Sequence, residues 1–127
     1  MKKAIFCKLI VFLFFIASCN VQNQSNPVQS KQIWMQINPV QCLENPWEQD
    51  WLKSHSNDYN SYKNSNEFDV IKDYYKKQGI VIFDIRQERT MQIVCDACSC
   101  PRGDTIYISI SDSDAGKMLN LGFKMPK

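Results

Sequence analysis

The clearest hydrophobic pattern in the chain is a strict alternation near its C-terminus. Three isoleucines alternate with a tyrosine and two serines over Thr105–Ser111. Because successive side chains of a β-strand point to opposite faces, this alternation predicts a half-buried strand. The run Ile80–Ile85 alternates similarly and predicts another strand, and its continuation to Val94 fits either one bulged strand or two strands. The short, partly alternating segment Ile33–Ile37 predicts an edge strand.

The stretch Asn45–Glu48 predicts the start of a helix. It offers an asparagine that can cap, a proline suited to the first helical position, and a glutamate three residues after the cap. We expect this helix to continue to about Ser54. Trp47 and Trp51 are four residues apart and therefore share one face. Core packing is the favoured role of this pair, and contact with a sugar or a peptide is the alternative.

A second helix is predicted from a cap at Ser65 or Asn66 through Gln78. Gly79 suits the left-handed conformation that commonly ends a helix. A short third helix is expected after Ser111. The second helix carries one apolar stripe, formed by Phe68, Ile71, Tyr74 and Tyr75.

The segment His55–Ser65 is polar and rich in turn-forming residues, so it predicts a loop. We expect Tyr59 and Tyr62 to be exposed or partly packed there, and His55, the only histidine, to be solvated rather than catalytic. The predicted fold class is α+β. Two helices and a short C-terminal helix pack against a small antiparallel sheet of two to four strands, and disulfides tie the domain together.

The N-terminus has the features of an export signal. Three lysines precede Leu9–Ile16, a wholly apolar run that would extend only about 12 Å as a helix, too short for a hydrocarbon core of about 30 Å. The run ends in Ile16-Ala17-Ser18-Cys19, which resembles the lipobox of bacterial lipoproteins. The resemblance implies cleavage before Cys19, a diacylglyceryl group on its sulfur, and anchoring in a lipid bilayer by acyl chains such as palmitate. The alternative is an ordinary signal peptide cut after Ser18.

These features divide the chain of 127 residues into a signal peptide (1–18), a polar flexible tether (19–32) and a single α+β domain (33–127). Removing the signal lowers the number of basic residues from 15 to 12 against 13 acidic ones, so the formal charge changes from +2 to −1. This charge does not indicate a nucleic-acid partner. The expected location is the cell envelope. Because Asn20 rather than aspartate follows Cys19, the outer membrane is expected if the cell is Gram-negative.

An even number of cysteines is left in the predicted domain: Cys42, Cys95, Cys98 and Cys100. In an exported chain this predicts two disulfides and no metal or other cofactor. A Cys98–Cys100 bond is disfavoured because one intervening residue would strain the ring. Two pairings stay open, Cys42–Cys100 with Cys95–Cys98, or Cys42–Cys98 with Cys95–Cys100. A zinc site and a redox pair are the alternatives to structural disulfides.

The second half of the cysteine-rich stretch predicts a recognition loop. Its candidate contact residues are Ser99, Pro101, Arg102, Gly103 and Asp104. Arg102 at a rigid loop tip would suit inhibition of a trypsin-like protease. Arg102–Asp104 also resembles the Arg-Gly-Asp tripeptide of integrin ligands, although the same residues are good turn formers. The chain has no catalytic triad, metalloprotease motif or glycine-rich phosphate loop, so we expect no enzymatic activity and no catalytic residues.

A broader pattern resembles small exported or lipoprotein domains of unassigned function. It combines Cys-x-x-Asn-Pro-Trp from Cys42, a helix with Tyr74-Tyr75, and Cys-x-x-Cys-x-Cys-Pro-Arg-Gly from Cys95. The resemblance spans about residues 40–124 and implies domain boundaries rather than chemistry. The sequence thus predicts a non-enzymatic binding or envelope-structural module, with an unknown protein as its possible partner. The alternatives are an envelope protease inhibitor and a cysteine metal or redox module.

Overall fold

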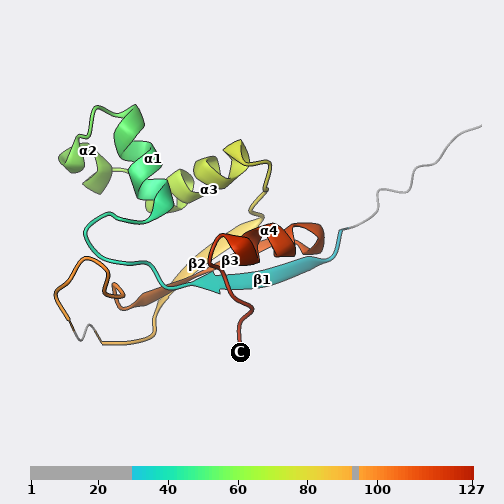
Figure 1. Ribbon diagram of the computed structural model, residues 1–127. Coiled ribbons are helices and arrows are strands. Elements are labelled where there is room, and N and C mark those ends of the chain that lie inside the picture. The colour runs from blue at the N-terminus through green and yellow to red at the C-terminus, as the bar shows by residue number, and fades with distance from the viewer. Residues whose placement is uncertain (1–29, 93–94) are drawn as a thin grey trace, which may run out of the picture.

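The computed structural model describes residues 30–92 and 95–127 (Figure 1). The predicted signal peptide, Cys19 and most of the predicted tether lie outside the described residues. The elements within them follow the order β1, α1, α2, α3, β2, β3, a 3-10 turn (Asp112–Asp114) and α4. The fold class is α+β, as predicted, and the described residues form an antiparallel sheet, four α-helices and two disulfides.

The sheet has three antiparallel strands in the order β1-β3-β2. They are β1 (Gln32–Ile37), β2 (Asp84–Arg89) and β3 (Asp104–Ser111). β3 lies in the middle, and β1 is at an edge, as predicted. Register places Met35 of β1 and Ile85 of β2 on either side of Ile108. All three side chains are buried, so the row marks the face of the sheet that carries the core.

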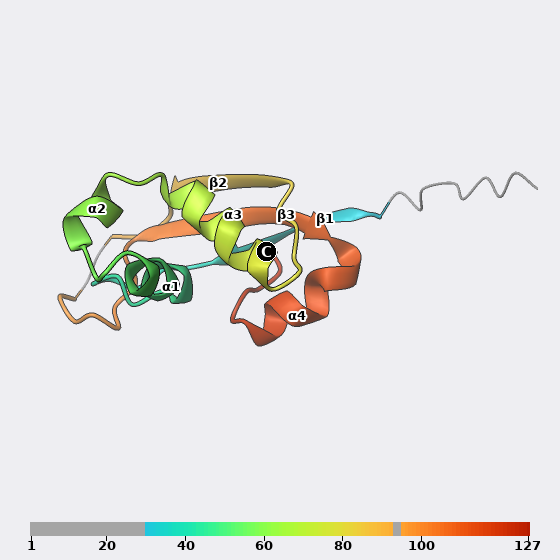
Figure 2. The ribbon, with the colours of Figure 1, turned by 90° about the horizontal axis from the view of Figure 1, so that it is seen from above.

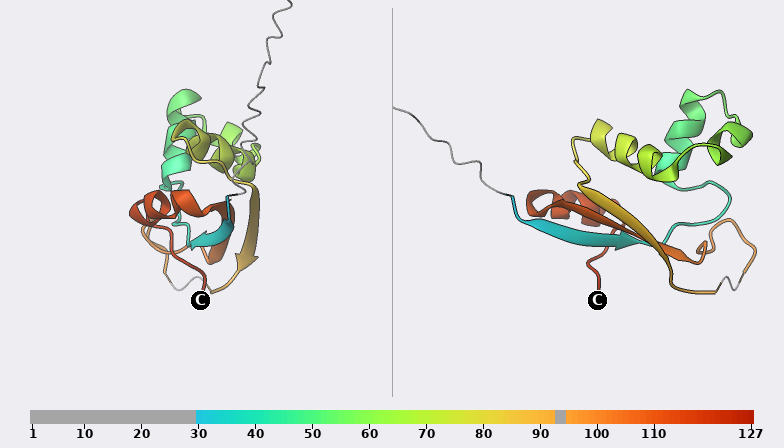
Figure 3. Two further views of the ribbon diagram at one scale, coloured as in Figure 1. Left: turned by 90° about the vertical axis from the view of Figure 1, so that its right-hand side faces the viewer. Right: turned by 180° about the vertical axis from the view of Figure 1, so that it is seen from behind.

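Two helices, α1 (Pro46–Ser54) and α3 (Glu67–Lys77), lie on one side of this sheet (Figures 1 and 3). The C-terminal helix α4 (Ala115–Asn120) packs beside β1, as the view from above shows (Figure 2). The largest fully buried side chains of the core are Trp47, Tyr75, Phe123, Met35, Ile71, Ile80, Ile106, Ile108, Ile110 and Met118. The core therefore forms between the sheet and its helices.

The opposite face of the sheet carries a smaller aromatic group. The Arg86 guanidinium lies 5.0 Å from the ring centre of Trp34 and 4.8 Å from that of Tyr107, so it contacts one ring on each of the other two strands. Such cation–π contacts stabilise an exposed face by about 0.5–1 kcal/mol each. Trp34 is thus separated from the helical side by the sheet itself.

The predicted helix ends are confirmed where the signals are local. The Asn45 backbone N–H donates to Glu48 Oε2 at 2.9 Å, as a capping box requires. Gly79 has φ +75° after α3, and Gly122 has φ +90° after α4. The Phe123 N–H then donates to the Met118 carbonyl at 3.0 Å, which closes α4.

Four features differ from the sequence-based expectations. Within the predicted loop, Tyr59–Lys63 form a short helix, α2, because the Asp58 carboxylate accepts the backbone N–H groups that begin it. Tyr62, expected to be exposed or partly packed, is buried, since its ring packs edge-on against Trp51. The predicted strand at Ile80 begins only at Asp84, and Gln32, assigned to the tether, is already in β1.

Among residues 30–92 and 95–127, no helix combines the length and the apolar character needed to cross a membrane.

Candidate functional site

The cysteine-rich stretch Cys95–Asp104, hereafter the stapled loop, is fixed to the segment before α1. Its two disulfides are Cys42–Cys98, with Cα atoms 5.1 Å apart, and Cys95–Cys100, with Cα atoms 6.1 Å apart. This is one of the two pairings that the sequence left open. Cys95 and Cys98, the alternative redox pair, are therefore bonded to different partners and not to each other.

Hydrogen bonds add to the disulfides in fixing the stapled loop to the segment before α1. The Gln41 N–H donates to the Cys100 carbonyl at 3.0 Å, and the Arg102 N–H donates to the Pro39 carbonyl at 2.8 Å. The Gln41 side chain donates to the Cys95 carbonyl at 3.0 Å. Figures 1 and 3 show the two segments side by side below the start of α1. Both covalent and backbone contacts therefore hold the loop.

Arg102 points into the protein rather than outward from the loop. Its Nη1 and Nη2 donate to the two carboxylate oxygens of Glu67 at 2.8 and 3.0 Å. Its Nε and Nη2 also donate to the two oxygens of Asp104, both at 2.9 Å. Only 27% of the side chain is exposed. These hydrogen bonds form two bidentate pairs with carboxylates, and charge-assisted hydrogen bonds are about twice as strong as neutral ones. They therefore hold the guanidinium of Arg102 inward.

Arg102 joins carboxylates from three elements, and we call Glu48, Glu67, Arg102 and Asp104 the arginine cluster. Glu48 of α1 is only 1% exposed and lies 3.5 Å from Arg102 Nη1. Gln87 of β2 adds a hydrogen bond of 2.7 Å to Asp104. The cluster therefore connects α1, α3 and the central strand to the stapled loop.

Burial and charge have opposite effects within the arginine cluster. Burial raises the pKa of Glu48, although hydrogen bonds from Asn45 and the charge of Arg102 oppose it. Burial also acts to raise the pKa of Asp104, but the hydrogen bonds and charge of Arg102 outweigh it and lower that pKa overall. Hydrogen bonds from Arg102 to Asp104 and Glu67 raise the pKa of Arg102 despite its burial. Arg102 therefore stays charged at any physiological pH.

The residues of the predicted recognition loop divide into two groups. Ser99 and Pro101 are exposed, whereas Gly103 and Asp104 are buried and Arg102 is mostly covered. The exposed surface of the stapled loop also includes Asp96 and Ala97. Contact with a partner would thus involve the outer side of the loop. The two charged side chains of the Arg-Gly-Asp tripeptide, Arg102 and Asp104, hydrogen-bond to each other within the arginine cluster.

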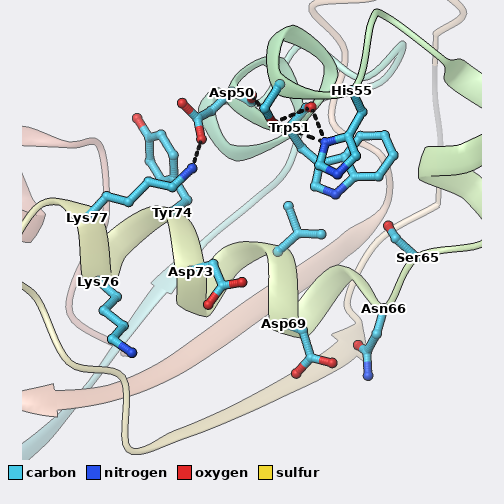
Figure 4. Close-up of a pocket in the computed structure, with 12 residues that line it drawn as sticks. Asp50, Trp51, His55, Ser65, Asn66, Asp69, Asp73, Tyr74, Lys76 and Lys77 are labelled. Atoms are coloured by element: carbon cyan, nitrogen blue, oxygen red, sulfur yellow. Dashed lines mark hydrogen bonds and ion pairs between the residues drawn. The ribbon is translucent and has the colours of Figure 1, made fainter.

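A cleft of about 620 Å³ lies between the second half of α1 and α3 (Figure 4). One wall is formed by Trp51 and His55, whose rings stack with centres 3.8 Å apart and an angle of 5° between planes. α3 contributes Asp69, Val70 and Asp73 to the lining, and the carboxylates of Asp69 and Asp73 point away from the Trp51–His55 pair in Figure 4. At one end, Lys77 pairs with Asp50 at 2.7 Å.

The ring of His55 has a defined hydrogen-bonding pattern. Its Nδ1 lies 2.8 Å from the Trp51 carbonyl oxygen, which can only accept a hydrogen bond. Nδ1 therefore carries the proton in the neutral ring, and Nε2 is an acceptor. His55 is exposed, as predicted, but it also stacks on Trp51 as part of the cleft wall.

The two tryptophans of α1 have different surroundings. Trp47 is fully buried, and its Nε1 lies within hydrogen-bonding distance of Glu67 Oε1, at 3.4 Å. Core packing is therefore confirmed for Trp47. Trp51 is half-buried at the cleft wall, where a ligand can reach it.

Within the two described ranges, no three His, Cys, Asp or Glu side chains are grouped so as to hold a metal ion. Comparison with known proteins adds no further guide, since no protein family, no curated protein and no solved structure matches the chain. The lipobox and the broader exported-domain pattern stay predictions.

Proposed function

We propose that this protein is a lipid-anchored, non-enzymatic binding module of the bacterial cell envelope. Acylated Cys19 would hold it to a bilayer, and the outer side of the stapled loop would contact a protein partner. The lipobox supports the anchor. The two disulfides support an oxidising, exported location, because disulfides persist in such compartments and are rare in the cytosol.

The observation that carries the binding role is the rigid attachment of the stapled loop. Two disulfides, two backbone hydrogen bonds and the arginine cluster fix this segment, yet Asp96, Ala97, Ser99 and Pro101 stay exposed. A loop that is already ordered loses little conformational entropy when a partner binds, and affinity rises accordingly. The inward direction of Arg102 gives no support to a protease inhibitor, since a protease subsite would need that side chain.

Metabolic labelling with an alkynyl palmitate tests the anchor. We expect the wild-type chain to incorporate label and to fractionate with membranes, and Cys19→Ala to lose both properties. Cys7→Ala is the matched control because Cys7 lies inside the predicted signal peptide and would leave with it. Labelling that persists in Cys19→Ala would contradict the lipoprotein assignment.

Site-specific photo-crosslinking in intact cells tests the partner surface. A photoreactive residue at Ser99 should yield one discrete adduct, identified by mass spectrometry, that decreases when Pro101 is also replaced by a bulky residue. The same probe at Asn120, exposed on α4, is the control. Equal adducts from both positions, or none from Ser99, would exclude the stapled loop as the contact surface.

A further inference from the structure

The cleft between α1 and α3 has the size and the wall of a small-molecule site. Its volume of about 620 Å³ falls within the range of about 300–1,000 Å³ typical of ligand pockets. Trp51 and His55 stack face to face, so one face of each ring covers the other and the outer face and edges of the stack are left for a ligand. A hydrogen bond from His55 to the α1 backbone holds the pair. Aromatic surfaces of this kind bind apolar faces of ligands while leaving their polar edges free.

The remaining lining is polar and mixes hydrogen-bond donors with acceptors. The Ser54 and Ser65 hydroxyls donate to the Trp51 and Tyr62 carbonyls, and the Asn66 side-chain oxygen accepts from the Phe68 N–H. These side chains therefore offer hydroxyl lone pairs and the N–H groups of the Asn66 amide, and Asp69 and Asp73 add carboxylates (Figure 4). Hydroxyls and amides both donate and accept, whereas carboxylates only accept. A ligand with many hydroxyl groups along its edge, each able to donate and to accept, matches this lining.

The charge of the cleft disfavours an ionic ligand. Asp50, Asp69 and Asp73 face Lys76 and Lys77, and the Lys77–Asp50 pair at 2.7 Å neutralises one charge of each sign. Asp69, Asp73 and Lys76 are left, so the net formal charge of the lining is only −1. Strongly charged ligands are recognised by a dominant field of one sign, which is lacking among these residues.

From the aromatic wall, the mixed polar lining and the small net charge, we propose that this cleft binds a neutral oligosaccharide of pyranose rings. One sugar ring would lie against the outer side of the Trp51–His55 stack, and hydroxyls of neighbouring rings would bond to Asp69, Asp73 and Asn66 on α3. The site lies along the second half of α1, whereas the stapled loop lies near its start. It depends neither on Cys19 lipidation nor on the protein partner, so its test is separate from theirs.

Calorimetric titration of the purified mature protein tests this inference. The probes are triacetylchitotriose and cellotriose, with a lysine-rich tripeptide as the charged comparison. We expect millimolar or tighter binding of at least one trisaccharide, little change with added salt, and no binding of the tripeptide. Binding of neither trisaccharide, or a strong decrease of affinity with salt, would overturn the proposal, because screening by salt weakens contacts between charges.

Substitutions then locate the sugar. Trp51→Ala should weaken binding at least about tenfold. Trp34→Ala is the matched control, since Trp34 lies on the opposite face of the sheet, and it should leave the affinity unchanged. If Trp34→Ala weakens binding and Trp51→Ala does not, the cleft is not the site.

A second pair of variants keeps the test valid if Trp51→Ala unfolds. Asp73→Asn changes an exposed carboxylate to an amide of the same shape and should weaken binding severalfold without loss of folding. Asp84→Asn on β2 is its control and should have no effect. Equal affinities of these two variants, together with unchanged binding by Asp69→Asn, would contradict the proposed hydrogen bonds.

Discussion

At the scale of single residues, Arg102 contributes most to the arrangement of this domain. It bonds to Glu67 and Asp104 and lies within reach of Glu48, so three carboxylates share one guanidinium. Burying ionised groups costs free energy unless they are paired and hydrogen-bonded. Removing the single cation would leave the carboxylates close together with no opposite charge.

Arg102→Ala should therefore destabilise the protein by about 2–4 kcal/mol, near the lower end of the range for broken buried ion pairs because the side chain is partly exposed. Arg102→Lys should lower the stability by less, since lysine keeps the positive charge and loses only the bidentate hydrogen bonds to the carboxylates. Urea unfolding measures both. Lys117→Ala removes an exposed pair with Asp114 and should change stability by less than about 1 kcal/mol. Equal losses for Arg102→Ala and Lys117→Ala would show that the arginine cluster contributes no more than a surface pair.

The same cluster predicts a pH dependence. The pKa of Asp104 is lowered from its ordinary value of 3.8, so its contribution to stability is complete above pH 3.8 and is lost as pH falls through the folded-state pKa. The stability difference between wild type and Asp104→Asn should accordingly shrink below pH 3.8.

The pKa of Glu48 is shifted in the opposite direction, so its effect on stability has the opposite pH dependence. Its raised pKa means that wild type loses stability relative to Glu48→Gln as pH rises above 4.5. Denaturant titrations at a series of pH values measure both differences, and pH-independent differences would contradict this account.

At the scale of elements, backbone conformation at helix ends determines where the chain turns. Gly79 follows α3 at φ +75°, a conformation that costs an L-residue about 1–2 kcal/mol. A methyl group added at Gly79 or at Gly116 would meet no atom of the described residues within 4 Å, so steric clashes do not complicate their replacement. The two glycines therefore form a matched pair that isolates backbone conformation.

Gly79→Ala should lower stability by about 1 kcal/mol, because alanine disfavours the left-handed region. Gly116→Ala, inside α4 and without a positive φ, should raise stability by about 0.5–1 kcal/mol because alanine favours the helix. Thermal and urea unfolding of both variants measure the effects. Destabilisation by Gly116→Ala would show that α4 needs a glycine for a reason other than conformation.

Elements with local signals could be predicted from the sequence. The cap at Asn45, the stop at Gly79 and the alternation of β3 each depend on residues within one turn or one strand. The short helix α2 was missed because five residues are too few for a helical period to be recognised. The apolar run before Asp84 packs as an irregular connection, although its alternation predicted a strand.

The candidate sites were only partly predictable because they depend on contacts between distant residues. Glu67, the partner that turns Arg102 inward, is 35 residues away in the chain. The choice between two disulfide pairings needed the position of Cys42 relative to the loop. Asp69 and Asp73 carry no sequence signal for the cleft, and of its lining only Trp51, His55 and the helix cap residues stand out in the sequence.

At the scale of the whole molecule, α1 separates two surfaces with different properties. The stapled loop lies near its start and is held by covalent bonds and charge. The cleft lies along its second half and is bounded by an aromatic stack and polar side chains. A protein with both would carry two ligands at once, since neither surface includes residues of the other.

The two disulfides should differ in their contribution to stability. By the loop-entropy relation, Cys42–Cys98, with a separation of 56 residues, contributes about 4 kcal/mol, and Cys95–Cys100, with a separation of 5, about 2 kcal/mol. Replacing each pair with serines and measuring unfolding in urea tests the order. Intact-mass analysis without reductant should first show wild type about 4 Da lighter than its reduced form, and each double variant about 2 Da lighter. A greater loss from the Cys95–Cys100 pair would contradict the entropic account.

The Cys42–Cys98 bond also determines how the protein would respond to mechanical force. If the chain is pulled from its two ends, tension passes through this bond and bypasses everything between the two cysteines, including α1, α3 and β2. β1, β3 and α4 lie outside the bypassed segment and would bear the load. Because Gln32 at the start of β1 pairs with Ser111 at the end of β3, pulling would unzip these two strands from that end. About 190 Å of extended chain, at about 3.4 Å per residue, would stay unextended until the bond is reduced. The segment between Cys42 and Cys98, which contains α1 and α3, would thus stay closed by the disulfide under forces that separate β1 from β3.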